Sequence, residues 1–251
     1  MAYTHPASPR RPLRWRPPVR ATDPRVQFGL WAVAWLGWLV LIEVAVFGVR
    51  GGGSLASALV LYGGGVAVSA FFLHRTFPHA TLGLCNAVTL ARLMAVAALS
   101  GPLVAGVVAP WAVFALAGLA LMLDGVDGWL ARREGRVSDF GARFDMEVDS
   151  ALALVLALHA FAGGSAGAVV LVLGLPRYGF FVAGLVFPWL DGPLPARFSR
   201  KVVCVVQLAV LIALQLPFVG GALGGVMAFA VVLALVWSFG RDVLWLWRAR
   251  G

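Results

Sequence analysis

Residues 123–150, LDGVDGWLARREGRVSDFGARFDMEVDS, concentrate acidic and basic side chains in a chain that is otherwise strongly apolar. Four of the aspartates form two pairs: Asp124 and Asp127 are three residues apart, and Asp145 and Asp149 are four apart. Spacings of three and four put both members of a pair on one face of a helix. The polar and small residues between the pairs allow two helices to return as antiparallel neighbours. The sequence therefore predicts that four carboxylates meet at one depth, near the ends of two helices.

The composition indicates an all-α, polytopic membrane protein with one membrane domain. Apolar residues make up 61% of the 251 residues, against roughly 45–50% in soluble domains, and charged residues only 12%. A helix needs about 20 residues to cross a bilayer. Eight apolar runs can each be made that long, which predicts about eight transmembrane helices. The runs are 28–49, 54–73, 87–108, 110–126, 144–163, 166–190, 201–218 and 222–246.

The net charge of +9 could suggest a nucleic-acid partner, but the basic residues are placed as membrane topology requires. When alternate connections are assigned to opposite sides, one side receives the tail 1–25, Arg75, the clusters at 132–143 and 197–201, and the C-terminus. The other side receives Arg50 alone. By the positive-inside rule, both termini and the quoted stretch are cytoplasmic. The strong use of Arg over Lys suggests a bacterium, hence its inner membrane, and we expect no nucleic-acid partner.

Four clustered carboxylates require cations. Two like charges about 4 Å apart repel by roughly 4 kcal/mol at an effective dielectric constant of 20. Hard divalent cations prefer oxygen ligands, and four carboxylates suit two such ions. Two ions roughly 4 Å apart form the usual clamp for phosphoryl chemistry. The alternative is a helix end whose aspartates pair with arginines among the lipid headgroups.

Small residues surround these carboxylates. Gly125, Gly128 and Gly141 carry no side chain, and Ala131 lies one turn after Asp127. They leave room for a flat or bulky ligand to approach the backbone. Arg132 follows as a candidate partner for a phosphate group. The first two apolar runs carry few polar groups. Glu43 is the exception, and we expect it to be solvated because it lies close to the outer end.

The pattern Asp-x2-Asp-Gly-x2-Ala-Arg-x8-Gly-x3-Asp-x3-Asp at 124–149 resembles the complete signature of the CDP-alcohol phosphotransferase family. NAVTLAR, residues 86–92, is similar to the opening of the family's first core helix. The resemblance implies a six-helix core, the CDP-alcohol phosphotransferase membrane domain (75–251), with two additional N-terminal transmembrane helices (26–74) outside it. The basic cytoplasmic tail (1–25) is predicted to be disordered, because it lacks the apolar content to fold.

The resemblance also implies an enzyme of phospholipid synthesis. Family members transfer a phosphoryl-alcohol group from a CDP-linked donor to an acceptor hydroxyl and release CMP. They use two divalent cations, Mg²⁺ or Mn²⁺, and commonly form homodimers. We expect CDP-diacylglycerol as the lipid donor, with its tails in the bilayer, and a polar alcohol as the acceptor. By matching position, the metal ligands are Asp124, Asp127, Asp145 and Asp149, and Asp149 is also the general base. The CDP-binding residues are Gly128, Ala131, Arg132 and Gly141.

Basic residues further along are candidates for an acceptor site. Arg177 lies inside an apolar run, where a charged residue is a functional candidate. Arg197, Arg200 and Lys201 form a cluster at the start of the seventh run. They either bind an anionic acceptor or act only as positive-inside anchors.

The segment RKVVCVVQ, residues 200–207, partly resembles phosphatidylglycerophosphate synthases. Lys201 and Gln207 match that pattern, whereas Val203 and Cys204 replace the expected Lys and Thr. The acceptor therefore stays open between glycerol 3-phosphate, inositol phosphate, serine and another polyol.

Two other classes compete with the enzyme. Carboxylates within a membrane can mark the path of a divalent-metal transporter, and the same fold could serve a non-catalytic lipid-binding protein. Transport would need polar groups near the midplane and on the outer side, but the acidic residues gather at one face. Every metal and base position of the signature is present, which favours the enzyme.

Overall fold

The computed structural model describes residues 23–48, 52–192, 194–195 and 197–250, and these residues form helices and no strand. The all-α prediction is confirmed. Most of the predicted disordered tail, and Arg50, lie outside the described residues. The elements are α1 (Pro24–Ala45), α2 (Gly52–Thr76), α3 (Leu84–Ala105), α4 (Pro110–Arg133), α5 (Asp139–Ala162), η1 (Ala168–Val170), α6 (Leu171–Gly174), α7 (Pro176–Val186), η2 (Pro188–Asp191), α8 (Phe198–Ala213) and α9 (Gly221–Arg248).

Local sequence sets several helix ends. Asp23 caps α1, because its carboxylate accepts from the Arg25 amide nitrogen at 2.9 Å, and a proline follows at the first helical position. Another proline, Pro110, begins α4. The helix α3 ends at Gly106, whose φ of 64° lies in the left-handed region that glycine adopts without strain.

Five helices, α1, α2, α3, α4 and α9, are long and apolar enough to cross a membrane. A sixth span results if residues Ala168–Gly174 and Pro176–Val186, which meet at a 64° bend, count as one. The predicted run 166–190 is thus broken at Pro176, which lacks an amide hydrogen and disfavours helix in the residue before it. The chain is a membrane protein with several apolar helices, while the count of eight spans stays a prediction.

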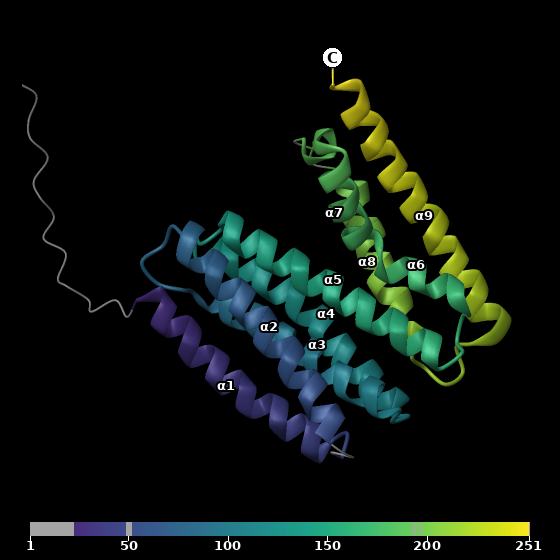
Figure 1. Cartoon of the computed structure of the whole chain (residues 1–251), viewed down its shortest axis with the longest axis horizontal. Coiled ribbons are helices and arrows are strands. Elements are labelled where there is room, and N and C mark those ends of the chain that lie inside the picture. The colour runs from purple at the N-terminus through teal and green to yellow at the C-terminus, as the bar shows by residue number, and fades with distance from the viewer. Residues whose placement is uncertain (1–22, 49–51, 193, 196, 251) are drawn as a thin grey trace, which may run out of the picture.

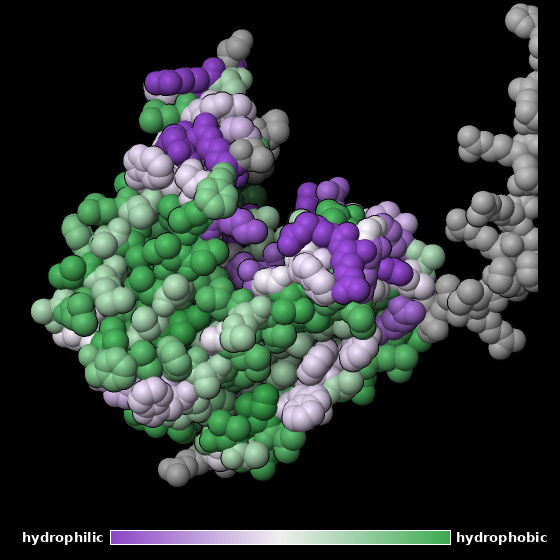
Figure 2. Space-filling model, turned by 180° about the vertical axis from the view of Figure 1, so that it is seen from behind, coloured by the Kyte–Doolittle hydropathy of each residue, from purple (hydrophilic) through white to green (hydrophobic). Residues whose placement is uncertain are grey.

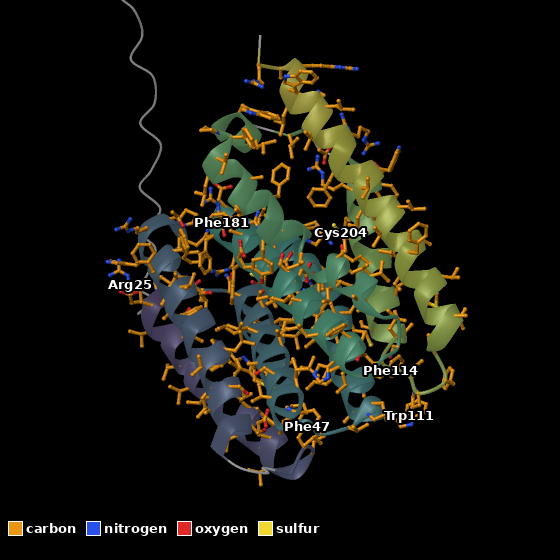
Figure 3. The ribbon with its side chains drawn as sticks, turned by 45° about the vertical axis from the view of Figure 1, so that its right-hand side comes forward. Arg25, Phe47, Trp111, Phe114, Phe181 and Cys204 are labelled. Atoms are coloured by element: carbon orange, nitrogen blue, oxygen red, sulfur yellow. The ribbon has the colours of Figure 1, made fainter. Side chains whose placement is uncertain are left out.

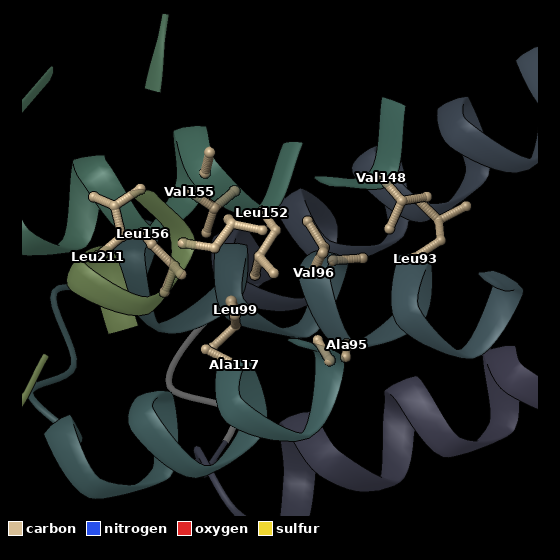
Figure 4. Close-up of a cluster of buried hydrophobic side chains, with 14 of the residues drawn as sticks. Leu93, Ala95, Val96, Leu99, Ala117, Val148, Leu152, Val155, Leu156 and Leu211 are labelled. Carbon is tan, nitrogen blue, oxygen red and sulfur yellow. The ribbon is translucent and has the colours of Figure 1, made fainter. Parts of the chain in front are cut away.

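The helix α3 is the centre of the molecule. Its apolar window is 83% buried, whereas the windows of the other four candidate spans are 17–28% buried. It contacts α1, α2, α4 and α5. In Figure 4, Leu93 of α3 lies beside Val148 of α5, and Leu156 of α5 lies beside Leu211 of α8. Because α3 has neighbours on every side, polar residues on it are withdrawn from lipid and water.

The helices form two groups. The long helices α1–α5 run alongside one another, and α7, α8 and α9 stand at an angle to them (Figure 1). The end at which α1, α3 and α5 begin is here called the polar end. Figure 2 shows hydrophilic side chains gathered there and lining a notch between the two groups, above a broad apolar surface. Arg25 lies at the polar end, and Phe47 and Trp111 lie at the opposite end (Figure 3). The notch gives polar molecules a route to helices that lipid otherwise surrounds.

The two N-terminal helices are joined to the core by specific hydrogen bonds. Trp35 of α1 donates its indole N–H to the carbonyl of Ala87 in α3 at 3.1 Å. The Tyr62 hydroxyl of α2 donates to the carbonyl of Ala32 in α1 at 2.8 Å. The helices α1 and α2 therefore pack as part of the same bundle as α3.

The expectation that Glu43 is solvated is wrong. Its side chain is 0% exposed, and its Oε2 atom accepts from the Ser54 hydroxyl at 3.0 Å. The carboxyl group fills the space where Gly101 of α3 has no side chain, so α1, α2 and α3 meet closely at this point. The helix α2 supplies the hydroxyl and covers the carboxyl group, which the sequence of α1 alone does not reveal.

This close approach makes Gly101 sensitive to substitution. A Cβ atom there overlaps the Glu43 carboxyl group, so we expect Gly101→Ala to lower the free energy of unfolding by about 1–3 kcal/mol, as overpacking does. The measurement is thermal unfolding in detergent. When Glu43 is also replaced by alanine, Gly101→Ala should no longer lower the free energy of unfolding by this amount, because the overlapping carboxyl group is gone.

The matched control is Gly64→Ala in α2, where a Cβ atom meets nothing within 4 Å. This change should be neutral or slightly stabilising, because alanine favours helix. Equal losses at both positions, or a loss at Gly101 that persists without Glu43, would contradict the close approach.

Candidate functional site

The four aspartates of the signature come together at the polar end. Asp124 and Asp127 lie in the last turns of α4, and Asp145 and Asp149 in the first turns of α5. The helices α4 and α5 extend beyond the predicted apolar runs 110–126 and 144–163, so only residues 134–138 connect them. Gly135, with a φ of 63°, permits the reversal. The Ser138 hydroxyl then caps α5 by accepting from the Gly141 amide at 3.1 Å.

Three of these carboxylates have the arrangement of a metal site. Asp124, Asp127 and Asp145 each offer one oxygen atom, and these oxygens lie within 4.8 Å of one another. Asp127 is only 5% exposed, and its Oδ2 atom accepts from the Thr89 hydroxyl of α3 at 3.0 Å. The predicted clustering of the acidic residues is therefore present in the structure.

The guanidinium of Arg92 on α3 lies among the four carboxylates. The Nη1 atom donates to Asp127 Oδ2 at 2.9 Å and to Asp145 Oδ1, and Nη2 donates to Asp149 Oδ1. The Nη2 atom also forms an ion pair of 3.1 Å with Asp124 Oδ1. The side chain of Arg92 is 0% exposed. The sequence prediction gave this arginine no role, although it lies three residues after Thr89 and so on the same helix face.

The side chains present fit a divalent cation. Aspartates Asp124, Asp127, Asp145 and Asp149, here called the carboxylate cluster, offer only oxygen ligands, which Mg²⁺ and Mn²⁺ prefer. When all four carboxylates are ionised, one guanidinium balances one of four negative charges and three remain for cations to balance. Two of the side chains, Asp145 and Asp149, are 38% and 31% exposed, so an ion and its water can reach them from outside.

A cavity of about 400 Å³ adjoins the carboxylate cluster, and we call it the inner cavity. It brings together residues from α3, α4, α5 and the connection between α4 and α5. Its lining includes all four residues predicted to bind CDP, together with two of the aspartates. These are Gly128, Ala131, Arg132, Gly141, Asp127 and Asp145. Asn86 and Thr89, from the NAVTLAR segment, also line it.

Three of the four basic candidates for the acceptor site, Arg177, Arg197 and Arg200, form ion pairs with acidic residues outside the four aspartates. Arg177 pairs with Glu147 of α5 at 2.5 Å. Glu147 lies two residues from both Asp145 and Asp149, so its side chain leaves α5 about 160° away from theirs. In the described residues no ion pair joins Arg177 to the carboxylate cluster. Its role in acceptor binding stays a prediction.

The other three candidates lie at the start of α8. Arg197 and Arg200 pair with the buried Asp242 of α9, at 3.4 and 2.8 Å. Lys201 is exposed. Asp242, which joins the start of α8 to α9 through these ion pairs, is not among the residues predicted from the sequence. Gln207 is buried, and its amide donates to the Leu173 carbonyl at 2.5 Å, which joins α8 to α6.

A comparison of the sequence with known families identifies the class of protein to which this all-helical bundle, with a carboxylate cluster at one end, belongs. The sequence model described as CDP-alcohol phosphatidyltransferase matches residues 82–237, more than half of the chain. The chain belongs to this family. It is therefore a transferase, and the family implies phosphatidyl transfer between a CDP-alcohol donor and an alcohol acceptor. The chain matches no curated protein and no solved structure. The helices α1 and α2 precede the matched residues.

The inner cavity supports a prediction about nucleotide binding. We expect Gly128→Leu to weaken CDP binding by about tenfold or more, because the new side chain occupies space that the ligand needs and crowding of this kind costs about 1–3 kcal/mol. Isothermal titration calorimetry of the purified protein with CDP in the presence of Mg²⁺ measures the change in the dissociation constant.

Gly125→Leu is the matched control, three residues earlier on α4. Gly125 is exposed, lies outside the lining of the inner cavity, and has open space where a Cβ atom would be. Wild-type affinity in both variants would mean that CDP binds elsewhere.

Proposed function

We propose that the protein transfers a phosphatidyl group from CDP-diacylglycerol to the hydroxyl of a polar alcohol and releases CMP. One observation supports this most strongly. The four aspartates of the family signature converge on the guanidinium of Arg92, and the other four signature residues line a cavity beside them. The two halves of the signature thus provide adjoining places for a diphosphate and for its nucleotide.

The carboxylate cluster would hold two divalent cations, Mg²⁺ or Mn²⁺. When bound, such ions neutralise the diphosphate and stabilise the charge on the departing CMP. The buried Asp127, fixed by Thr89, would be the most rigid ligand. The more exposed Asp145 and Asp149 face incoming substrate.

Residues of the inner cavity would position the nucleotide. Gly128, Ala131 and Gly141 keep it open, because none carries a side chain larger than a methyl group. The exposed Arg132 extends back over the helix, and its Nη1 atom would lie 3.5 Å from a Cβ at position 128. This guanidinium is placed to pair with a phosphate of the donor.

Asp149 would be the general base. Its side chain is 31% exposed, so the hydroxyl of an acceptor can come within hydrogen-bond reach of it. Asp149 takes the hydroxyl proton, and the acceptor oxygen forms a bond to the phosphorus that carries the diacylglycerol. The bond from that phosphorus to the oxygen of CMP breaks, and CMP leaves with the bonding electrons.

Arg177, Arg197, Arg200 and Lys201 remain the candidates for binding the acceptor. Lys201 is exposed and forms no ion pair among the described residues, so it can meet an anionic group without breaking an existing contact. Lys201 and Gln207 fit the phosphatidylglycerophosphate synthase pattern and favour glycerol 3-phosphate. Val203 and Cys204 depart from it, so inositol phosphate, serine and other polyols are kept in the test.

The charge distribution supports a cytoplasmic active site in a bacterial inner membrane. Among the described residues, the loops at the end opposite the site, 46–48, 106–109, 163–167 and 214–220, contain no Arg or Lys. Basic residues such as Arg75, Arg136 and Arg248 lie at the polar end. By the positive-inside rule this end is cytoplasmic. Eight spans would place both termini on the cytoplasmic side. The protein would also form a homodimer, as members of the family commonly do.

The direct test is CMP release by detergent-purified protein supplied with CDP-diacylglycerol and Mg²⁺ or Mn²⁺. It is run with glycerol 3-phosphate, inositol 1-phosphate, serine, inositol or no acceptor. We expect release that depends on one acceptor and stops when the metal is chelated. Asp149→Asn should lower the rate at least about 100-fold, because a general base contributes about 10²–10⁴.

Asp139→Asn is the control, since Asp139 begins the same helix and is exposed. It should keep the wild-type rate. Full activity of Asp149→Asn would exclude this aspartate as the base. No release with any acceptor, combined with metal flux into vesicles, would favour the transporter instead.

A further inference from the structure

Arg92 lies in a position where an isolated charge would be unfavourable. It follows Leu84, the first residue of α3, by eight positions, which places it about 12 Å along the helix. Its side chain is 0% exposed, and α3 is the most enclosed of the five candidate spans. A charged group removed from water needs partners of opposite charge. Arg92 has four, more than any other basic residue in the described part of the chain.

The contacts of Arg92 follow a regular scheme. Each of its two terminal nitrogens serves two carboxylates, one on α4 and one on α5. Each carboxylate contributes a single oxygen: Oδ1 of Asp124, Asp145 and Asp149, and Oδ2 of Asp127. In the described structure, no hydrogen bond or ion pair uses the second oxygen of any of the four. Arg92 thus holds one oxygen of each carboxylate, and the other oxygen of each is available to a cation.

We propose that Arg92 is a positioning residue that orients the aspartates of the metal site from the α3 side. The inference rests on the proposed function in one respect, namely that the carboxylate cluster binds divalent cations. The planar guanidinium presents its donors in a fixed fork and holds one oxygen of each carboxylate from the α3 side. The second oxygens are thereby directed to the cations. Groups that hydrogen-bond to metal ligands orient them in this way.

The charges agree with this role. Four carboxylates and one guanidinium carry a net charge of minus three, and two divalent cations change it to plus one. A slightly positive site suits a donor diphosphate. Without Arg92 the same ions would leave the site neutral.

A different role is that of a substitute cation, in which the guanidinium only occupies the place of a metal and leaves when the metal binds. The two roles predict opposite effects of removing it. If Arg92 competes with the metal, its loss strengthens cation binding. If Arg92 positions the ligands, its loss weakens cation binding by about 10–100-fold, the usual effect of removing such a partner.

The test is Mn²⁺ binding by the full-length protein in detergent, measured as free Mn²⁺ by electron paramagnetic resonance. We expect Arg92→Gln to weaken binding by about 10–100-fold. Arg92→Lys keeps the positive charge but lacks the planar fork, so it too should bind Mn²⁺ more weakly than wild type. Arg133→Gln is the matched control, because Arg133 is exposed and lies over the Trp129 ring at 4.9 Å. It should bind as wild type does.

Each outcome decides between the possibilities. Unchanged or tighter Mn²⁺ binding by Arg92→Lys overturns the positioning role, even if Arg92→Gln does not fold. Weaker binding by Arg92→Lys, in a protein that unfolds at a similar temperature, supports it. A wild-type protein that binds no Mn²⁺ contradicts the metal site itself, and so the proposed function, separately from the role of Arg92.

Discussion

Four carboxylates at the ends of two neighbouring helices repel one another, and the fold at the polar end depends on how that repulsion is balanced. The guanidinium of Arg92 supplies one positive charge from the most buried helix and contacts all four. Because α3 touches both α4 and α5, it fixes where these helices approach each other. The cluster still carries excess negative charge, so it remains a place for further cations rather than a closed ion-pair network.

The position of this cluster explains how a membrane protein can act on a substrate that is both polar and lipid-linked. The apolar outer surface of the bundle suits lipid tails, while hydrophilic side chains line the notch at the polar end (Figure 2). A donor can keep its acyl chains in the bilayer while its diphosphate reaches the carboxylate cluster and its nucleotide the inner cavity. After the bend at Pro176, the helices α7, α8 and α9 stand at an angle to α1–α5 (Figure 1).

The sequence predicted the helical class and the convergence of the aspartates because both follow from local spacing. Asp145 and Asp149 continue the stripe of Leu152 and Leu156, so the face that packs on α3 ends in carboxylates. Contacts between helices far apart in sequence were beyond such reasoning. The prediction that Glu43 is solvated was wrong, because Ser54 and the space at Gly101 enclose its carboxyl group. The partners of Arg92 and Arg200 depend on how α3 and α9 pack.

The central claim is that the carboxylate cluster holds two divalent cations that serve phosphatidyl transfer. A crystal structure of the protein with Mn²⁺ and CDP, with anomalous diffraction measured at the manganese edge, tests it most directly. We predict two anomalous peaks roughly 4 Å apart, bridged by oxygens of Asp124, Asp127, Asp145 and Asp149, with the CDP diphosphate on the same ions. A cluster without anomalous signal, or manganese bound elsewhere while CDP occupies the inner cavity, would contradict it.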